Sequence, residues 1–194
     1  MSEDPGRLHR RRPPVALVVA LGCAAASTGS TPTLSDGPLG HGGDSVTACM
    51  TKQNASAMVT GLDVVRNSSD EPVTLDRAEL VGASGVTLTG ARVADVSGDR
   101  SLFGHVNGDP PRGMSKEQRL LVESSRPLAG FSLPPGSTGA VDNVLMYLRL
   151  HDPAVTAEIQ HLRVYYHQGS RPYLWQDNAH FILYAGSACP DPTS

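Results

Sequence analysis

The sequence predicts an all-β fold, an antiparallel β-sandwich of about seven or eight short strands, and three observations support this. Apolar residues recur with a period of two over short runs, as in strands with one buried face. Clusters of Gly, Pro, Asn, Asp and Ser separate these runs at fairly regular spacing. Across residues 59–96, where Val, Thr and Gly are common, no apolar stripe with helical spacing occurs.

Residues 59–96 are interpreted as three strands joined by two turns. The first strand is expected to place Met58, Leu62 and Val64 on one face, with Thr60 between them. Residues 67–72 and 82–85 are the turns, because Asn, Ser, Asp, Gly and Pro favour chain reversal.

The second and third of these strands each contain a change of parity. Val73 and Leu75 alternate in one register, and Ala78 and Leu80 continue in the other. After Gly90 the apolar positions shift again. A parity change inside one strand is what a β-bulge produces, so one bulge is predicted in each strand.

The C-terminal half continues the β pattern. Val144, Met146, Leu148 and Leu150 alternate with residues that are also partly apolar, which predicts a central strand buried on both faces. Residues 159–166, 173–175 and 181–184 are further strands, and residues 166–171 form a hairpin turn.

Residues 99–125 are the least ordinary segment. The stretch is polar and rich in turn formers, and Ser115 is a candidate cap for a one-turn helix. We interpret it as a solvated crossover between the two sheets. Alternatively, a loop of this length inside a compact domain is functional or mobile.

Length and charge narrow the function classes. The 194 residues suit one domain behind a leader. The net charge is −3, and four of the arginines lie within residues 1–22, so no basic patch for nucleic acid remains in the domain. Arg outnumbers Lys fourteen to two, and with abundant Ala, Gly, Val and Pro this is typical of a GC-rich genome, such as that of an actinobacterium.

The N-terminal region has the parts of a secretory signal. A basic run is followed by a short apolar core and small residues, which predicts a signal peptide over 1–22, a flexible tether over 23–45 and a sandwich domain over 46–190. The apolar core is too short to span a bilayer as a permanent helix. Ala20-Leu21-Gly22-Cys23 resembles the bacterial lipobox, which implies lipidation of Cys23 and anchoring to the outer face of the cell membrane. Cleavage at residues 24–26 and secretion is the alternative.

The other two cysteines flank the predicted domain. Cys49 precedes the first predicted strand and Cys189 follows the last. In an oxidising compartment, an even number of cysteines in these positions predicts a disulfide that joins the two ends of the domain. Two independent buried thiols and a metal pair are the alternatives.

The sequence contains no recognisable catalytic constellation. There is no GxSxG elbow, and no histidine pair has HxH or HExxH spacing, so we expect a non-enzyme without a cofactor. His151, His161, His167 and His180 are interpreted as exposed side chains. The aromatic cluster of one hairpin is expected to fill or cap the core, with a partner-binding face as the alternative. Its members are Tyr165, Tyr166, Tyr173 and Trp175.

Two resemblances bear on function. Residues 67–75, with the pattern N-x-x-x-x-P-V-x-L, are similar to a phrase in secreted actinobacterial lipoproteins of unknown function. Residues 80–84 and the turn at residues 134–136 resemble those of periplasmic copper chaperones, which implies an Ig-like or cupredoxin-like sandwich. Those chaperones bind copper through His and Met after the first phrase, where this chain has only His105 and Met114, at a distance.

We therefore expect a membrane-tethered extracytoplasmic lipoprotein with a binding or structural role, in contact with the membrane through its lipid and with an envelope protein as a candidate partner. Nucleic acid is not expected as a partner. The alternative function is a copper-binding chaperone that uses His105 and Met114.

Overall fold

The structure is a computed structural model, and it describes residues 37–40, 42–98 and 100–190. Within these ranges the chain is an all-β sandwich with one α-helix, which confirms the predicted fold class. It forms eleven strands, more than the seven or eight expected, because several are only two to four residues long. The elements are β1 (Gly42–Thr51), β2 (Ala57–Val65), β3 (Val73–Val81), β4 (Val86–Asp95), β5 (Gly104–Asn107), α1 (Lys116–Ser124), β6 (Arg126–Pro127), β7 (Ser132–Leu133), the 3-10 helix η1 (Gly136–Thr138), β8 (Asp142–Leu150), β9 (Ala157–Ile159), β10 (His161–Gln168) and β11 (Arg171–Tyr184).

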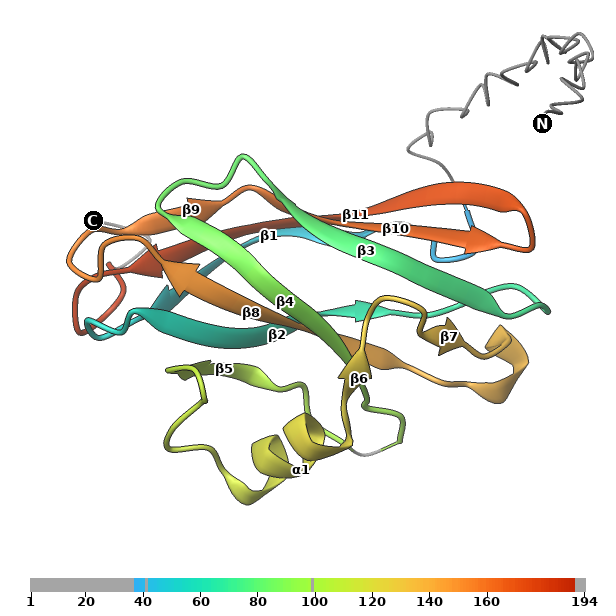
Figure 1. The fold of residues 1–194 in the computed structure, drawn as a ribbon, viewed down its shortest axis with the longest axis horizontal. Coiled ribbons are helices and arrows are strands. Elements are labelled where there is room, and N and C mark those ends of the chain that lie inside the picture. Colours follow the sequence, from blue (N-terminus) through green and yellow to red (C-terminus); the bar gives the residue numbers. More distant parts are fainter. Residues whose placement is uncertain (1–36, 41, 99, 191–194) are drawn as a thin grey trace, which may run out of the picture. The chain divides into compact units, whose positions relative to one another are not determined.

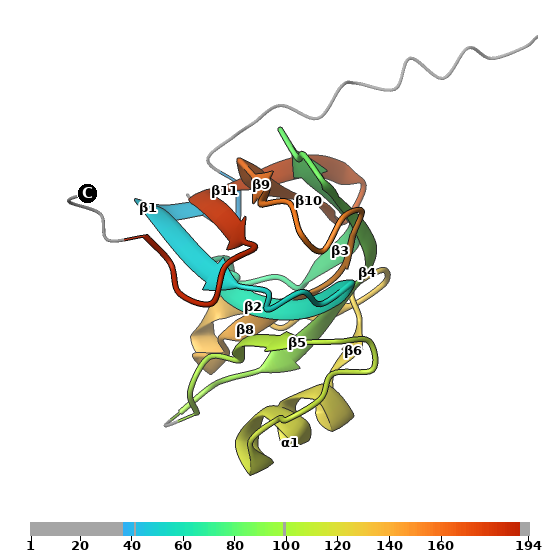
Figure 2. The same ribbon diagram turned by 90° about the vertical axis from the view of Figure 1, so that its left-hand side faces the viewer.

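Two sheets form the sandwich (Figures 1 and 2). The first has the order β1-β11-β10-β3-β7, with β9 also paired to β11. The second has the order β5-β2-β8-β4-β6, so β8 is the central strand that the sequence predicts. All pairings are antiparallel except that of β1 with β11, which is parallel.

The parallel edge strand β1 begins earlier than the expected domain boundary at residue 46. β1 starts at Gly42, and Leu39 ahead of it is 6% exposed and belongs to the core. The backbone N–H of Leu39 donates to the hydroxyl of Tyr166 at 3.4 Å. The last residues assigned to the tether therefore belong to the sandwich.

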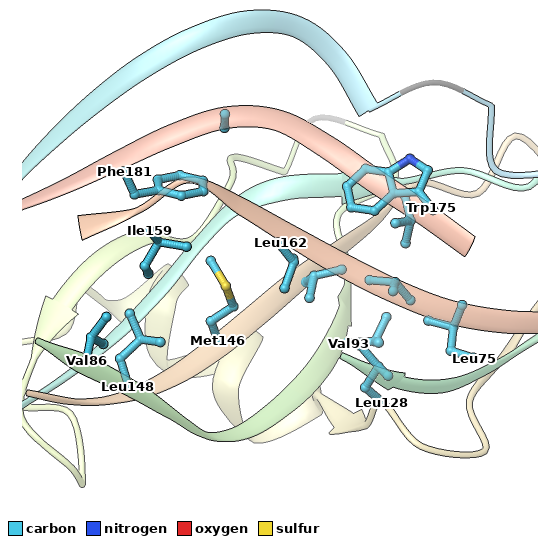
Figure 3. Packing of buried hydrophobic residues seen from close by; sticks show 14 of the residues in the cluster. Leu75, Val86, Val93, Leu128, Met146, Leu148, Ile159, Leu162, Trp175 and Phe181 are labelled. Carbon is cyan, nitrogen blue, oxygen red and sulfur yellow. The ribbon is translucent and has the colours of Figure 1, made fainter. Parts of the chain in front are cut away.

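The main core fills the space between the two sheets. Figure 3 shows Met146 and Leu148 from the second sheet facing Ile159, Leu162 and Phe181 from the first. These side chains are at most 1% exposed. Burying an aliphatic or aromatic side chain of this kind contributes roughly 1.5–3 kcal/mol to the free energy of unfolding, so the core is the main source of stability.

Residues 99–125 do not cross between the sheets, which corrects the sequence interpretation. β5 pairs with β2, β6 pairs with β4, and α1 lies on the outer side of the same sheet (Figure 2). The apolar residues of the segment form a second core with residues of that sheet, which is why the segment folds back. The buried members are Val59, Ala94, Val96, Phe103, Val106, Leu121 and Leu145.

The predicted cap of α1 is confirmed. The Ser115 hydroxyl accepts a hydrogen bond from the Gln118 backbone N–H at 3.1 Å, and the Gln118 side-chain oxygen accepts one from the Ser115 backbone N–H at 2.9 Å. This reciprocal arrangement is a capping box, which satisfies amides that a helix start otherwise leaves without partners. The helix runs for nine residues rather than one turn.

Both predicted bulges are present. In β3, Leu75 and Arg77 pair with the adjacent Tyr166 and Tyr165, which leaves one extra residue between them. In β4, the register shifts between Leu88 and Gly90.

A third bulge, in β2, was not predicted, and it corrects the expected burial pattern. The register with β8 shifts between Thr60 and Asp63. Asp63 therefore faces the interior, while Val64 is 41% exposed. An extra residue moves every later side chain of a strand to the opposite face.

Asn67 organises the first turn from a buried position. Its side-chain amide donates to the backbone oxygens of Glu71 at 2.7 Å and Pro134 at 3.0 Å. Its oxygen accepts from the Ser69 N–H at 3.0 Å and the Ser69 hydroxyl at 2.8 Å. Because the side chain is only 2% exposed, the folded domain does not present this Asn-Ser-Ser sequon for glycosylation.

The predicted disulfide joins Cys49 of β1 to Cys189 beyond β11, with the two Cα atoms 6.0 Å apart. It spans 140 residues of sequence and therefore closes almost the whole sandwich into one loop.

We expect the double substitution Cys49→Ser and Cys189→Ser to lower the free energy of unfolding by about 3–5 kcal/mol, because a bridge over a loop of this size restricts the unfolded chain. Urea unfolding of the full chain measures the change. Cys23→Ser is the matched control, since it removes a cysteine without touching the bridge. Equal stability of the double variant and the wild type would contradict the expectation.

Candidate functional site

The two copper candidates differ in their surroundings. The His105 side chain lies on the exposed side of β5. Partial burial of its ring lowers its pKa. Met114 packs against the second core beside α1. Among the residues that the structure describes, no three His, Cys, Asp or Glu side chains lie close enough together to hold a metal ion.

Each of the four C-terminal histidines lies beside one polar partner. His151 Nε2 lies 2.7 Å from Thr87 Oγ1, His161 Nδ1 lies 3.5 Å from Asp177 Oδ1, His167 Nδ1 lies 2.8 Å from Asp76 Oδ1, and His180 Nε2 lies 3.8 Å from Glu158 Oε2. Three of these partners are carboxylates on neighbouring strands of the first sheet. Only His151 is exposed as expected, the other three histidines are half-buried, and the partner of His161 is the buried Asp177.

The hairpin aromatics divide between the two faces of the first sheet. Tyr166 and Trp175 are 1% and 3% exposed and belong to the main core. Tyr173 stacks on Tyr166 with ring centroids 5.3 Å apart. Tyr165 lies on the other face, where its hydroxyl donates to Glu79 at 2.6 Å and its ring lies 3.3 Å from the Arg77 guanidinium carbon. Strand alternation therefore places some of these residues in the core and others on the surface. The four side chains do not form one shared aromatic face.

Cys23 and residues 1–22 lie outside the described residues. In the described part of the chain, no helix is long and apolar enough to cross a membrane.

A cleft of about 510 Å³ opens between the edge strand β1 and the second half of β2. We call it the β1–β2 cleft. Most of its wall is apolar, and Val46 and Val64, which are 53% and 41% exposed, lie along it. The lining residues are Leu39, Gly42, Gly43, Asp44, Val46, Ala48, Leu62, Asp63, Val64, Arg66, Trp175, Ala179 and Phe181.

The cleft exists because both flanking strands are irregular there. Between Gly42 and Val46, β1 carries two more residues than the facing part of β11. Among the described residues, the pairing of β2 with β5 ends at Gly61, so the β2 residues that follow are not paired with β5. Each strand therefore leaves one backbone edge without a strand partner beside the cleft.

The β2 bulge that directs Asp63 inward is supported by its neighbours. The Asn143 side chain donates to the Asp63 backbone oxygen at 2.7 Å. Gly61 is required beside it, because a Cβ at this position would lie 2.5 Å from Leu145 Cδ2 and 2.8 Å from Asn143 Oδ1.

Asp177 lies at a discontinuity of the first sheet. The pairing of β10 with β11 ends one residue before Asp177, at Gln176, and β9 pairs with β11 only from Phe181 onward. The Asp177 Oδ1 atom accepts the backbone N–H of Leu162 at 2.8 Å. The side chain thus replaces a missing strand acceptor, and it is 0% exposed.

Asp63 and Asp177 lie close enough between the sheets for the charge of Asp63 to raise the pKa of Asp177, and we call them the carboxyl pair. The Oδ2 atom of each residue is buried and has no hydrogen-bond partner among the described residues. Two ionised carboxylates offer only acceptors, so a proton on one of them is the donor that this pair otherwise lacks. Burial raises the pKa of Asp63 to about 6. Burial, followed by the nearby charge of Asp63, raises the pKa of Asp177 to about 8. Near neutral pH the pair therefore holds one proton and one negative charge.

A second cavity, of about 410 Å³, lies near the start of β8, and its charges are arranged differently. Asp95 and Arg100 form an exposed ion pair at 3.4 Å on its wall. Burial, with a smaller contribution from Asp95, raises the pKa of Asp142 to about 6. The cationic groups Arg100 and Arg126 also line this cavity. The β1–β2 cleft is the stronger candidate site because Asp63, the carboxyl on its wall, forms no ion pair among the described residues, whereas Arg100 pairs with Asp95 in the second cavity.

Sequence reasoning missed the carboxyl pair. Asp63 stands at a position that regular alternation assigns to the surface, and Asp177 lies in a segment that the strand assignment left between two strands. The one available signal was Gly61, since a glycine inside a strand often marks a bulge.

The comparisons with known proteins identify no relative. No protein-family model matches the chain, and a search of curated protein sequences found no similar protein.

We expect Asp177→Asn to make the protein more stable at pH 8, by about 2 kcal/mol, and to flatten its pH dependence. Both folded-state pKa values lie above the ordinary value of 3.8. Between pH 3.8 and these folded-state values, the folded chain therefore binds more protons than the unfolded chain. Stability contributed by the pair is therefore full below about pH 3.8, and it is lost as the pH rises from there through the folded-state pKa values of about 6 and about 8. The amide keeps an acceptor for Leu162 and a donor for Asp63.

Urea unfolding from pH 5 to pH 8.5 measures the effect. Asp70→Asn, on an exposed turn, is the control for removing one negative charge. If Asp177→Asn and the wild type lose the same stability over this pH range, the buried pair does not hold a proton near neutral pH.

Proposed function

We propose that this chain is an extracytoplasmic binding module, held on the outer face of the cell membrane by lipid on Cys23, and that it takes a ligand in the β1–β2 cleft. Two features support the location. Ala20-Leu21-Gly22-Cys23 resembles a lipobox, and disulfides such as Cys49–Cys189 persist in oxidising compartments outside the cytoplasm.

The cleft is the observation that carries the binding role. Its volume of about 510 Å³ lies within the range of small-molecule sites, and such sites combine apolar walls with a few polar groups. Here the apolar walls come from both sheets, and Asp63 is the buried polar group.

The composition of the wall favours binding over catalysis. Among the described residues that line the cleft there is no Ser, Thr, Cys, His or Lys, so the carboxylates of Asp44 and Asp63 are the remaining side chains of a nucleophilic kind. The described residues offer the ligand a shaped apolar surface and a carboxylate.

Trp175 provides a direct test, because it is the chain's one tryptophan and it lines the cleft. We expect small apolar molecules chosen from cationic, neutral and anionic classes to include some that change its fluorescence saturably. Val46→Phe narrows the cleft from an exposed position and is expected to weaken that binding. If no molecule of any class binds at millimolar concentration, the binding role is wrong.

For the membrane location, we expect the wild-type chain expressed in a bacterium to enter the detergent phase of a Triton X-114 partition, and Cys23→Ser to enter the aqueous phase. A lipid chain contributes about 0.8 kcal/mol per buried CH₂, and the substitution removes its attachment site. The Cys49→Ser, Cys189→Ser variant is the control and remains in the detergent phase. Recovery of Cys23→Ser in the detergent phase would contradict lipid anchoring.

A further inference from the structure

The Asp63 carboxyl lies at the inner wall of the β1–β2 cleft with unused capacity to accept hydrogen bonds. It is 7% exposed, and its Oδ2 atom is buried without a hydrogen-bond partner among the described residues. An ionised carboxylate accepts up to about four hydrogen bonds. Among the described residues, no N–H group and no hydroxyl donates to it. A buried acceptor in this state favours a donor supplied by a ligand.

The charged groups around the cleft leave the carboxyl pair uncompensated. The cleft lining includes one exposed cation, Arg66, and one exposed anion, Asp44, so their charges offset each other. On the far side of the pair, His161 Nδ1 lies 3.5 Å from Asp177 Oδ1 without a hydrogen bond. No salt bridge to Asp63 occurs among the described residues. The negative charge that faces the cleft is therefore available to a cation.

The rest of the cleft fits the apolar part of such a ligand. Leu39, Leu62 and Phe181 supply aliphatic and aromatic wall. Figure 3 shows the indole nitrogen of Trp175 on the edge of the ring that faces away from Leu75 and Val93 in the core. A tryptophan ring also attracts cations through its π-system.

We infer that the β1–β2 cleft binds a small organic ammonium ion with an apolar body, whose N–H groups donate to the Asp63 carboxylate. The apolar body lies against Leu62, Trp175 and Phe181. This inference rests on the proposed binding function and names the ligand class for its site.

Three probes of similar size and different charge test the inference: benzylammonium, benzyl alcohol and benzoate. Each is titrated into the full chain at pH 7.5, with Trp175 fluorescence and calorimetry as readouts. We expect benzylammonium to bind about tenfold or more tightly than benzyl alcohol, since a charge-assisted hydrogen bond is roughly twice as strong as a neutral one. Benzoate is expected to bind most weakly, because it meets a buried charge of the same sign.

Asp63→Asn keeps the shape of the side chain and removes its charge, so it is expected to abolish the preference for benzylammonium. Asp70→Asn, which removes one negative charge from an exposed turn, is expected to leave the preference unchanged. For the wild type, lowering the pH from 7.5 to 5 protonates the pair fully and is expected to weaken benzylammonium binding about tenfold, a result that does not depend on the variant folding.

Two outcomes overturn the inference. If benzyl alcohol or benzoate binds as tightly as benzylammonium, or if Asp63→Asn retains the preference, the cleft binds ligands but does not select ammonium ions. If none of the three probes binds, the ammonium assignment is also wrong. In that case, the Trp175 fluorescence test with the wider set of cationic, neutral and anionic apolar molecules shows separately whether the cleft binds any ligand.

Discussion

The apolar interior between the two sheets accepts side chains only from alternate positions of each strand, and the rest of the structure depends on this constraint. A strand whose sequence breaks the alternation must add a residue or expose its apolar side chains. The bulges in β3 and β4 keep apolar residues pointing inward after a parity change. The bulge in β2 has the opposite effect, because it exposes Val64 and sends the carboxyl of Asp63 into the interior. An acid is placed there at a cost to stability.

The sequence predicted the features that depend on local chemistry. Turn formers, parity changes and the Ser115 cap each act through neighbouring residues, so they were visible without the fold. The disulfide followed from the positions of Cys49 and Cys189 at the two ends of the strand pattern. The strand β1 was not predicted, because its first half is exposed on both faces and its Gly, Asp and Ser residues have the composition of a linker.

The candidate site was out of reach for a different reason. Asp63 and Asp177 are more than a hundred residues apart, and they meet only because β2 and β11 belong to facing sheets. Neither residue lies in a motif, and Asp63 is turned inward by the bulge of its own strand. A search for histidines and short motifs therefore pointed to residues such as His105, while the cleft arises from two edges that the topology brings together.

The parallel pairing of β1 with β11 also determines how the domain responds to mechanical load. A pull on the chain ahead of Gly42 acts along β1, so its hydrogen bonds to β11 are loaded in shear and must fail together rather than one at a time. Beyond them, the covalent bond from Cys49 to Cys189 takes up the tension and prevents β1 from peeling off the sheet. A pull on the N-terminal side of the domain is thus carried through one edge strand, and the cleft lies directly beside that strand.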